Sequence, residues 1–412
     1  MLDLQPASTR ARTSRRRFGL ALAGGGPLGA FYEVGTLHAI GEAFEGLDLN
    51  DLEMYVGVSS GAMVAAGLAN GFDTTELGVV FIHNASLDYP VAPGLFLRPA
   101  VREYLGRLAS VPGTATEIIT QYLRDPGKSW AEALDPLGRL LPTGLFDNRP
   151  FERFLAELFS GHGRSNDFRE LRHKLFIVAT ELNGGYSVRF GGPGQDAVPI
   201  SRAIQASTAL PGLYPPVQID GHTYVDGALM RTMNASLLLN AGVDLAICVN
   251  PLVAFDAASA PRRQGRDGPV DLTRGGLPVV LSQTFRALIQ SRMKVGMASY
   301  EQRYPRTDVL LFEPDRGDDE LFFKNVFSYA DRKRLAEHAY LRTRRDLLAN
   351  SDAVGRILGR HGLRLRRDIL EDGTRSFQRA IHERRRRLQP ITGSLHRTLD
   401  RLESTVRVGL RA

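Results

Sequence analysis

Along the first 70 residues, short apolar runs of strand length alternate with longer stretches in which large apolar side chains recur at helical spacing. Residues 18–23 are apolar and end at three glycines, and residues 30–40 have the helical spacing. A second apolar run at 54–56 is followed by the small, apolar stretch 61–70. The order strand, glycine turn, helix, strand, helix predicts an α/β fold with a mostly parallel central sheet between two helical layers.

The same alternation returns after residue 148 and continues to residue 348. It predicts helices at 148–159, 200–207, 279–300 and 330–348, and strands at 175–180, 186–190, 243–249 and 308–312. The strand at 186–190 is expected to form a hairpin with the strand before it, and the strand at 308–312 is expected to join the main sheet. The predicted architecture is three-layer α/β/α with a helical C-terminal extension.

Proline, glycine and charge divide the chain into five predicted parts. These are a basic arm at 1–17, the main domain at 18–255, a linker or loop at 256–276, a helical and strand extension packing on the core at 277–350, and a basic amphipathic helical tail at 351–412. Within the main domain, seven prolines interrupt residues 86–143. This segment is either an ordinary helical insertion or a lid over the site, and its composition fits both.

Positive charge is concentrated at the C-terminal end of the chain. The net charge is +7, and residues 351–412 alone contain 15 arginines against seven acidic residues. After four consecutive arginines, apolar residues recur at Leu388, Ile391, Leu395, Leu399, Leu402 and Val406. Such a helix can bind an anionic membrane or lipid-body surface, or it can instead pack on the body or on a second copy of the chain. No nucleic-acid partner is expected, and a homo-oligomer stays open.

Two further features bear on the compartment of the protein. Cys248 is the single cysteine and lies in an apolar run, which excludes an intramolecular disulfide. No apolar run approaches the roughly 18 to 20 residues of a membrane-spanning helix. Residues 14–18 imitate a twin-arginine export signal, but the apolar run after them includes the glycine turn, so a basic arm is favoured. A cytoplasmic protein, peripheral to membranes at most, is expected.

Three short motifs, far apart in the sequence, together predict a hydrolytic site. Residues 57–61 have the form G-x-S-x-G, which places Ser59 on a sharp turn between a strand and a helix. The glycines at 24–26 can direct backbone N–H groups toward an oxyanion, and Asp226 can deprotonate the serine. Ser59 is the predicted nucleophile of an acyl transfer to water. Each motif alone has a simpler explanation, as a capping serine, a glycine-rich turn or an Asp-Gly turn.

The glycine turn also fits the G-x-G-x-x-G motif of dinucleotide-binding folds, through Gly24, Gly26 and Gly29. That fold requires an acidic residue at the end of the second strand, where it binds a ribose hydroxyl. Here the second strand ends in Gly-Val-Ser at 57–59. A nucleotide site is therefore disfavoured.

A third catalytic residue is not evident in the sequence. In a triad hydrolase of this motif type a histidine follows the acidic residue, and the candidates here are His338, His361, His382 and His396. None of them lies at a predicted strand end, and His222 sits in a tight loop just before Asp226. A dyad of Ser59 and Asp226 is therefore predicted, in which partial desolvation raises the pKa and the basicity of the Asp226 carboxylate.

The three motifs, in this order, resemble those of the patatin-like phospholipase family. Similarity to less specific stretches of that family extends the resemblance to about residues 18–251, through segments 144–148, 179–183, 206–211 and 214–216. The resemblance implies a patatin-like fold and hydrolysis of lipid acyl esters without metal or cofactor. It implies that Ser59 is the nucleophile and Asp226 its base, that Gly24, Gly25 and Gly26 are oxyanion donors, and that the supporting glycines are Gly29, Gly57, Gly61 and Gly227.

One position departs from the family pattern. Many members have a basic residue in the glycine turn, where this chain has Leu28 after Pro27. The backbone N–H donors are unaffected by this change, but the basic side chain that could attract a phosphate-bearing substrate is missing. Phospholipids and neutral lipid esters therefore both stay open as substrates. The sequence predicts a lipid acyl hydrolase of the phospholipase, lysophospholipase or lipase type. A triad-type esterase and a catalytically idle lipid-binding or scaffold protein are the alternatives.

Overall fold

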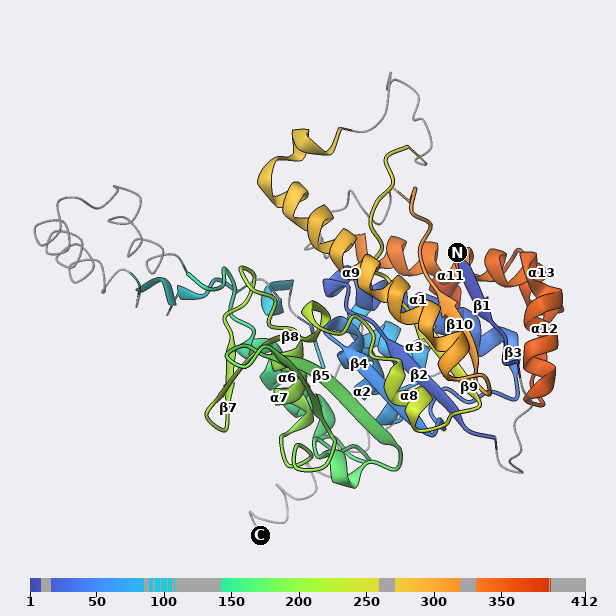
Figure 1. Cartoon of the computed structure of the whole chain (residues 1–412), viewed down its shortest axis with the longest axis horizontal. Coiled ribbons are helices and arrows are strands. Elements are labelled where there is room, and N and C mark those ends of the chain that lie inside the picture. The colour runs from blue at the N-terminus through green and yellow to red at the C-terminus, as the bar shows by residue number, and fades with distance from the viewer. Residues whose placement is uncertain are drawn as a thin grey trace, which may run out of the picture.

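The computed structural model of the chain describes residues 1–8, 16–84, 89–91, 93–96, 98–101, 103–105, 107, 142–258, 271–318, 331–384 and 386. In this part, nine strands form one sheet (Figure 1). Its order is β1 (Leu2–Gln5), β10 (Asp308–Phe312), β9 (Leu245–Val249), β2 (Phe18–Leu22), β4 (Met54–Val58), β5 (Lys174–Glu181), β8 (His222–Asp226) and β7 (Val217–Ile219), and β6 (Tyr186–Phe190) pairs with β5.

The central strands of the sheet run in one direction. The pairs β10–β9, β9–β2, β2–β4 and β4–β5 are parallel, whereas β1, β6, β7 and β8 are added in antiparallel pairs. The predicted hairpin of β5 and β6 and the predicted entry of β10 into the main sheet are both confirmed. The strand β1 was not anticipated, because its four residues lie within the predicted basic arm.

Successive residues of the central strands alternate in size, so that larger side chains lie on one face of the sheet and smaller ones on the other. Leu20 and Leu22 of β2 join the larger core cluster, while Ala21 joins the smaller cluster on the opposite face. In β9, Ile247 and Cys248 divide in the same way. Because successive strand residues point to opposite faces, the apolar strands bury both faces of the sheet.

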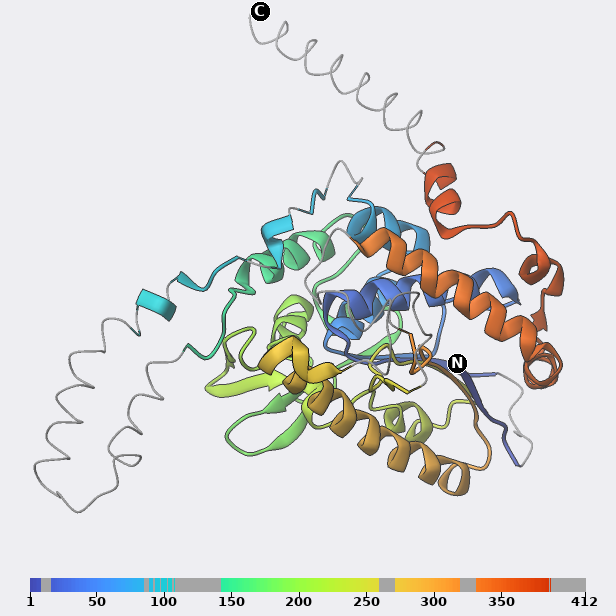
Figure 2. The same ribbon diagram turned by 90° about the horizontal axis from the view of Figure 1, so that it is seen from above.

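Helices cover both faces and complete three layers, as Figure 2 shows from above. The larger cluster is covered by α1 (Gly26–Ala43), α2 (Ser60–Ala69), α6 (Arg149–Phe159), α7 (Ile200–Ser207) and α11 (Arg332–Ala349). The smaller cluster is covered by α8 (Ser236–Asn240) and α9 (Gly276–Arg303). Shorter elements are α3 (Thr74–Leu77), the π-helical turn Gly78–Ile82, α12 (Ser351–Arg360), α13 (Arg367–Glu371) and a small sheet of β3 (Phe44–Glu45) and β11 (Arg364–Leu365). The predicted three-layer α/β/α fold with a helical C-terminal region is confirmed.

The helix α1 is enclosed by protein along most of its length. Its residues from Leu28 to Ile40 are all buried, and α11 packs along it as a second helical layer. At the crossing, Gly35 lies so close to α11 that an added methyl group would overlap the carbonyl oxygen of Ala336. A helix that is apolar on all sides is expected to be buried in this way.

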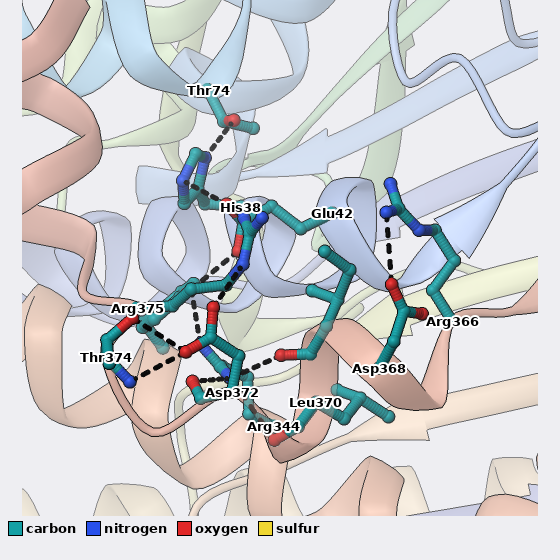
Figure 3. Close-up of polar contacts among 12 residues, drawn as sticks. His38, Glu42, Thr74, Arg344, Arg366, Asp368, Leu370, Asp372, Thr374 and Arg375 are labelled. Carbon is teal, nitrogen blue, oxygen red and sulfur yellow. Dashed lines mark hydrogen bonds and ion pairs between the residues drawn. The ribbon is translucent and has the colours of Figure 1, made fainter.

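The first part of the tail packs on the body through a polar cluster (Figure 3). Glu42 of α1 accepts hydrogen bonds from Arg375 at 2.8 Å and from the Tyr340 hydroxyl at 2.5 Å. Arg344 of α11 donates to the backbone carbonyls of Ile369, Leu370 and Asp372. Since Phe377 and Ile381 are also fully buried, this region belongs to the folded body up to at least residue 381.

Several predictions concern residues outside the described part. These include most of the insertion or lid at 86–143, most of the linker at 256–276, and the apolar stripe from Leu388 to Val406. Among the described helices, none is both long and apolar enough to cross a membrane.

Candidate active site

Ser59 lies on the turn between β4 and α2, where its backbone adopts a φ of 52°, a value uncommon for a residue with a side chain. The two glycines of G-x-S-x-G make this turn sterically feasible. A methyl group on Gly57 would overlap Ala62 of α2, and one on Gly61 would come within 2.7 Å of the carbonyl oxygen of Ala23. The sharp turn therefore depends on backbone contacts that only glycine allows.

The strand β5 brings Ser59 and Asp226 together. Val58, the last residue of β4, pairs with Val178, and Asp226, the last residue of β8, pairs with Ala179. Because β6 occupies the other edge of β5, β4 and β8 share one edge and run toward each other along it. Their ends meet at adjacent residues of β5, although Ser59 and Asp226 are 167 positions apart in the sequence.

A short hydrogen bond joins the two side chains. The Ser59 hydroxyl donates to Oδ2 of Asp226 at 2.6 Å. The other carboxylate oxygen, Oδ1, accepts the backbone N–H of Ala228 at 2.8 Å. Ser59 is 5% exposed and Asp226 is 3% exposed. The carboxylate is thus held in a fixed orientation with one oxygen directed at the serine.

Burial changes the acidity of Asp226. Desolvation disfavours its charged form and raises the pKa to about 6, while the hydrogen bonds from Ser59 and from the Ala228 backbone act in the opposite direction. The carboxyl group is therefore mostly ionised at neutral pH, and it is a stronger base than an exposed aspartate. This is the chemistry required of a group that accepts and then returns a serine proton.

The glycine turn lies directly beside the serine. A methyl group on Gly24 would come within 2.9 Å of Cβ of Ser59, and Gly26 adopts a φ of 64° at the start of α1. The N–H of Gly24 donates a long hydrogen bond of 3.4 Å to the carbonyl of Thr232. Among the described residues, no acceptor is found for the N–H groups of Gly25 and Gly26. These two donors, at a helix N-terminus, are available to an anion.

A comparison with known protein families identifies the group to which the chain belongs. The sequence model of the family described as patatin-like phospholipase matches residues 20–239, more than half of the chain, and the match includes all three motifs. The chain belongs to the patatin-like phospholipase family.

The solved structures that resemble this chain are distant from it in sequence. VipD from Legionella pneumophila shares 17% sequence identity over 61% of this chain and 54% of its own, with a TM-score of 0.31. The type III effector protein ExoU shares 17% identity over 92% of this chain and 64% of its own, with a TM-score of 0.27. ExoU in complex with SpcU, from Pseudomonas aeruginosa, shares 14% identity over 85% and 69%, with a TM-score of 0.25. The chain thus spans only 54% and 64% of the length of the first two proteins.

Two further glycines of the patatin-like motifs are explained by close packing. A methyl group on Gly29 would come within 3.0 Å of the Ser60 hydroxyl and 3.1 Å of the Pro251 ring. A methyl group on Gly227 would overlap the carbonyl oxygen of Val178. The segment that carries Asp226 therefore lies directly against the point of β5 where β4 ends.

Sequence reasoning missed the part played by Ser207. Its buried hydroxyl donates to the carbonyl of Val178 at 2.6 Å and accepts the backbone N–H of Ser59 at 2.8 Å. Two residues later, the carbonyl of Ala209 accepts the N–H of Asp226 at 3.0 Å. The segment at 206–211 thus holds the backbone of both Ser59 and Asp226. Its similarity to the patatin-like family was the only available signal, and it gave no role to the serine.

The histidines considered for a triad form contacts elsewhere. His338 lies 2.6 Å from Asp318, and His361 lies 2.7 Å from Asp308. Within the described residues, the Asp226 carboxylate bonds only to Ser59 and to the Ala228 amide. His382 bonds to neither dyad residue, and His396 lies outside the described part. His222 begins β8 at the end away from Asp226, 4.0 Å from Glu181.

Proposed function

We propose that the protein is a lipid ester hydrolase that cleaves carboxylic esters through a Ser59 acyl-enzyme, with Asp226 as the general base. The observation that carries this proposal is the 2.6 Å hydrogen bond between the two side chains. Membership of the patatin-like phospholipase family supports the lipid nature of the substrate. The finer assignment to a phospholipase, lysophospholipase or lipase is part of the same proposal.

In the proposed reaction, the Ser59 oxygen attacks the ester carbonyl and its proton passes to Oδ2 of Asp226. The resulting oxyanion accepts hydrogen bonds from the N–H groups of Gly25 and Gly26, and from Gly24 once its long bond to Thr232 is given up. Asp226 then returns the proton to the leaving alcohol. Water attacks the acyl-enzyme by the same steps and releases the fatty acid.

A single carboxylate can serve as both acceptor and donor because of its surroundings. The pKa of Asp226 is raised to about 6 by burial, which brings it nearer to neutral pH than that of an exposed aspartate. General acid–base catalysis is most effective when the pKa of the group lies close to the working pH. The bond from Ala228 fixes one oxygen and leaves the other to exchange the proton with Ser59.

The glycine turn supports a broad rather than a phosphate-specific substrate. Pro27 and Leu28 occupy the positions where a basic residue would attract a phosphate group, so recognition there depends on backbone N–H groups. We therefore propose that the common element of the substrates is the acyl ester. The tail from 388 to 406 is a proposed contact with anionic lipid.

Comparison of Ser59→Ala with Ser60→Ala tests the nucleophile on a panel of phospholipid, lysophospholipid and neutral lipid esters. Ser59→Ala and Asp226→Asn should each lower kcat by at least about 10³-fold while the circular dichroism spectrum is unchanged. Ser60→Ala is the matched control, because its buried hydroxyl has no hydrogen-bond partner among the described residues. It should stay within about tenfold of the native rate. Full activity of Ser59→Ala would refute the proposal.

Labelling with a fluorophosphonate probe separates the proposed enzyme from an idle scaffold of the same fold. The native protein should be labelled at Ser59, and Ser59→Ala should not be. A folded native protein that resists the probe would favour the scaffold. His382→Ala and His396→Ala should keep activity, because the proposed mechanism uses no histidine. A loss of activity in either variant would favour the triad esterase.

A further inference from the structure

The helix α9 exposes a row of large apolar side chains. Leu277, Val280, Leu281, Phe285, Leu288 and Val295 are all exposed, with Leu288 at 58% and Leu277 at 68%. Positions 277, 281, 285, 288 and 295 lie on one side of the helix, because they are separated by three, four or seven residues. We call these six residues the α9 stripe. Figure 1 shows the first turns of α9 extending away from the sheet.

The stripe faces outward because polar side chains occupy much of the inward side of α9. The Gln290 side chain accepts the N–H of Ala254 at 3.1 Å, and Gln283 both accepts from and donates to the backbone of Phe255. Arg286, only 7% exposed, donates to the carbonyl of Val253. These bonds fix the rotation of the helix. Its apolar row is therefore held on the surface by specific contacts.

The same helix is joined to the segment that follows Asp226. Arg292 donates to the carbonyl of Leu229 at 2.7 Å, and the Thr232 hydroxyl donates to the carbonyl of Ile289. Met230, next to the Leu229 carbonyl that Arg292 binds, is also exposed. Exposed apolar side chains gathered on one face of a helix mark an interaction site.

The charge on α9 indicates which kind of surface it meets. In α9 the acidic residue is Glu301 in the last turn, whereas the basic residues are Arg286, Arg292, Lys294 and Arg303. Arg292, Lys294 and Arg303 are exposed. An apolar row flanked by positive charge is complementary to an anionic lipid surface, which accepts the apolar side chains and attracts the basic ones.

We propose that the α9 stripe docks the protein on anionic lipid membranes, with Leu277, Leu281, Phe285 and Leu288 inserted at the level of the headgroups. The link to activity rests on the proposed function: docking through α9 would bring the Asp226 side of the site to the surface that contains the substrate. This surface consists of other residues than the tail at 388–406, which lies outside the described residues.

Binding to vesicles is measured with Ser59→Ala as the parent protein, so that no lipid is consumed. Sedimentation with phosphatidylcholine–phosphatidylglycerol vesicles should show binding by the parent. Adding Leu281→Glu and Leu288→Glu should weaken that binding by at least about tenfold, because two apolar contacts are lost and two negative charges gained. Vesicles of phosphatidylcholine alone should bind the parent more weakly.

The matched control adds the same two negative charges far from α9. His162→Glu and Ala197→Glu alter exposed positions in the loops before β5 and after β6, near the start of β5. This variant should bind anionic vesicles within about twofold of the parent. Equal weakening in both variants would reduce the effect to net charge and overturn the docking role of the stripe.

Other results overturn the proposal directly. Unchanged vesicle binding after Leu281→Glu and Leu288→Glu would do so, as would equal binding to neutral and anionic vesicles. A parent dimer that these two substitutions dissociate, with vesicle binding unchanged, would assign the stripe to a second copy of the chain.

Hydrolysis by the active protein separates this inference from the proposed function. With Ser59 present, Leu281→Glu and Leu288→Glu should keep the native rate on a soluble short-chain ester and lose rate on anionic vesicles. If no Ser59-dependent hydrolysis is found but vesicle binding behaves as expected, the proposed function fails and the docking surface stands.

Discussion

Apolar helices lie on both faces of the sheet, but α1 on one face is buried, whereas α9 on the other face exposes many of its apolar side chains. On one face, α1 is enclosed by α2 below and α11 above, and its residues from Leu28 to Ile40 are buried. On the other face, α9 forms the outer layer, buries Ile289, Met293 and Met297, and leaves the α9 stripe in solvent. Both helices are rich in apolar residues, but within the described part of the chain only α1 has a second helical layer over it. An apolar sequence therefore predicts burial only where the fold provides a cover.

Ser59 and Asp226, the proposed dyad, lie where these two layers meet. Ser59 begins α2, which packs in the larger core cluster with α1. Two residues after Asp226, Ala228 belongs to the smaller cluster beneath α9. The hydrogen bond between them thus connects an enclosed layer with one that has an exposed outer surface. Substitutions of Asp226, of α1 and of α9 should therefore change activity and stability by clearly different amounts.

The largest expected effect is on the pH dependence of catalysis. In the proposed mechanism the ionised Asp226 carboxylate is the base, and its pKa is raised to about 6, so kcat/KM should fall about tenfold per pH unit below pH 6. Asp226→Asn should lose at least about 10³-fold in rate and also lose this dependence. A native profile that stays flat down to pH 5 would contradict the role of Asp226.

Stability should change with pH in the opposite sense. A carboxyl group whose pKa is raised by folding binds its proton more tightly in the folded state, so its stabilising contribution is full below about pH 4 and is lost as pH rises through 6. Relative to Asp226→Asn, the native protein should therefore lose about 2 kcal/mol of unfolding free energy between pH 4 and pH 7. Urea unfolding of both proteins across this range measures the difference.

The next effect compares one leucine from each layer. Leu37 of α1 is fully buried, whereas Leu288 of α9 is 58% exposed. Leu37→Ala should lower the free energy of unfolding by about 2–5 kcal/mol, since it leaves a cavity in a packed core. Leu288→Ala should stay within about 0.5 kcal/mol. Comparable losses in chemical denaturation would mean that the stripe is covered in solution.

The smallest effect compares the glycines inside the two helices. A methyl group at Gly35 would overlap the backbone of α11, whereas at Gly296 the nearest atom would be the Tyr300 hydroxyl at 3.9 Å. Gly35→Ala should destabilise the protein by roughly 1–3 kcal/mol, because α1 and α11 must separate. Gly296→Ala should stabilise it by roughly 0.5–1 kcal/mol through better helix propensity. The Tm of thermal unfolding should fall for Gly35→Ala and rise for Gly296→Ala. A change of Tm in the same direction for both variants would contradict the difference between the layers.

Much of the fold could be predicted from local sequence pattern. The helix at 200–207 and the strand at 308–312 have the predicted bounds, because periodicity and flanking proline or glycine mark such elements clearly. The strand β1 could not be predicted in the same way. Its four residues, Leu-Asp-Leu-Gln, become a strand only by pairing with β10, more than 300 positions away. The rotation that turns the apolar row of α9 outward likewise depends on its hydrogen bonds to residues 253–255. The apolar pattern of α9 alone does not reveal these bonds.

For the candidate site, the sequence by itself determined the chemical groups: a serine on a glycine-flanked turn, a glycine-rich helix start and an aspartate after a strand. Only the tertiary structure decided that the serine and the aspartate lie 2.6 Å apart and that Ser207 holds the turn. The physical reason is that residue spacing reports local conformation, whereas this contact depends on β4 and β8 pairing with adjacent residues of β5. Such strand pairing depends on contacts between residues far apart in the sequence, which form only when the whole sheet is packed.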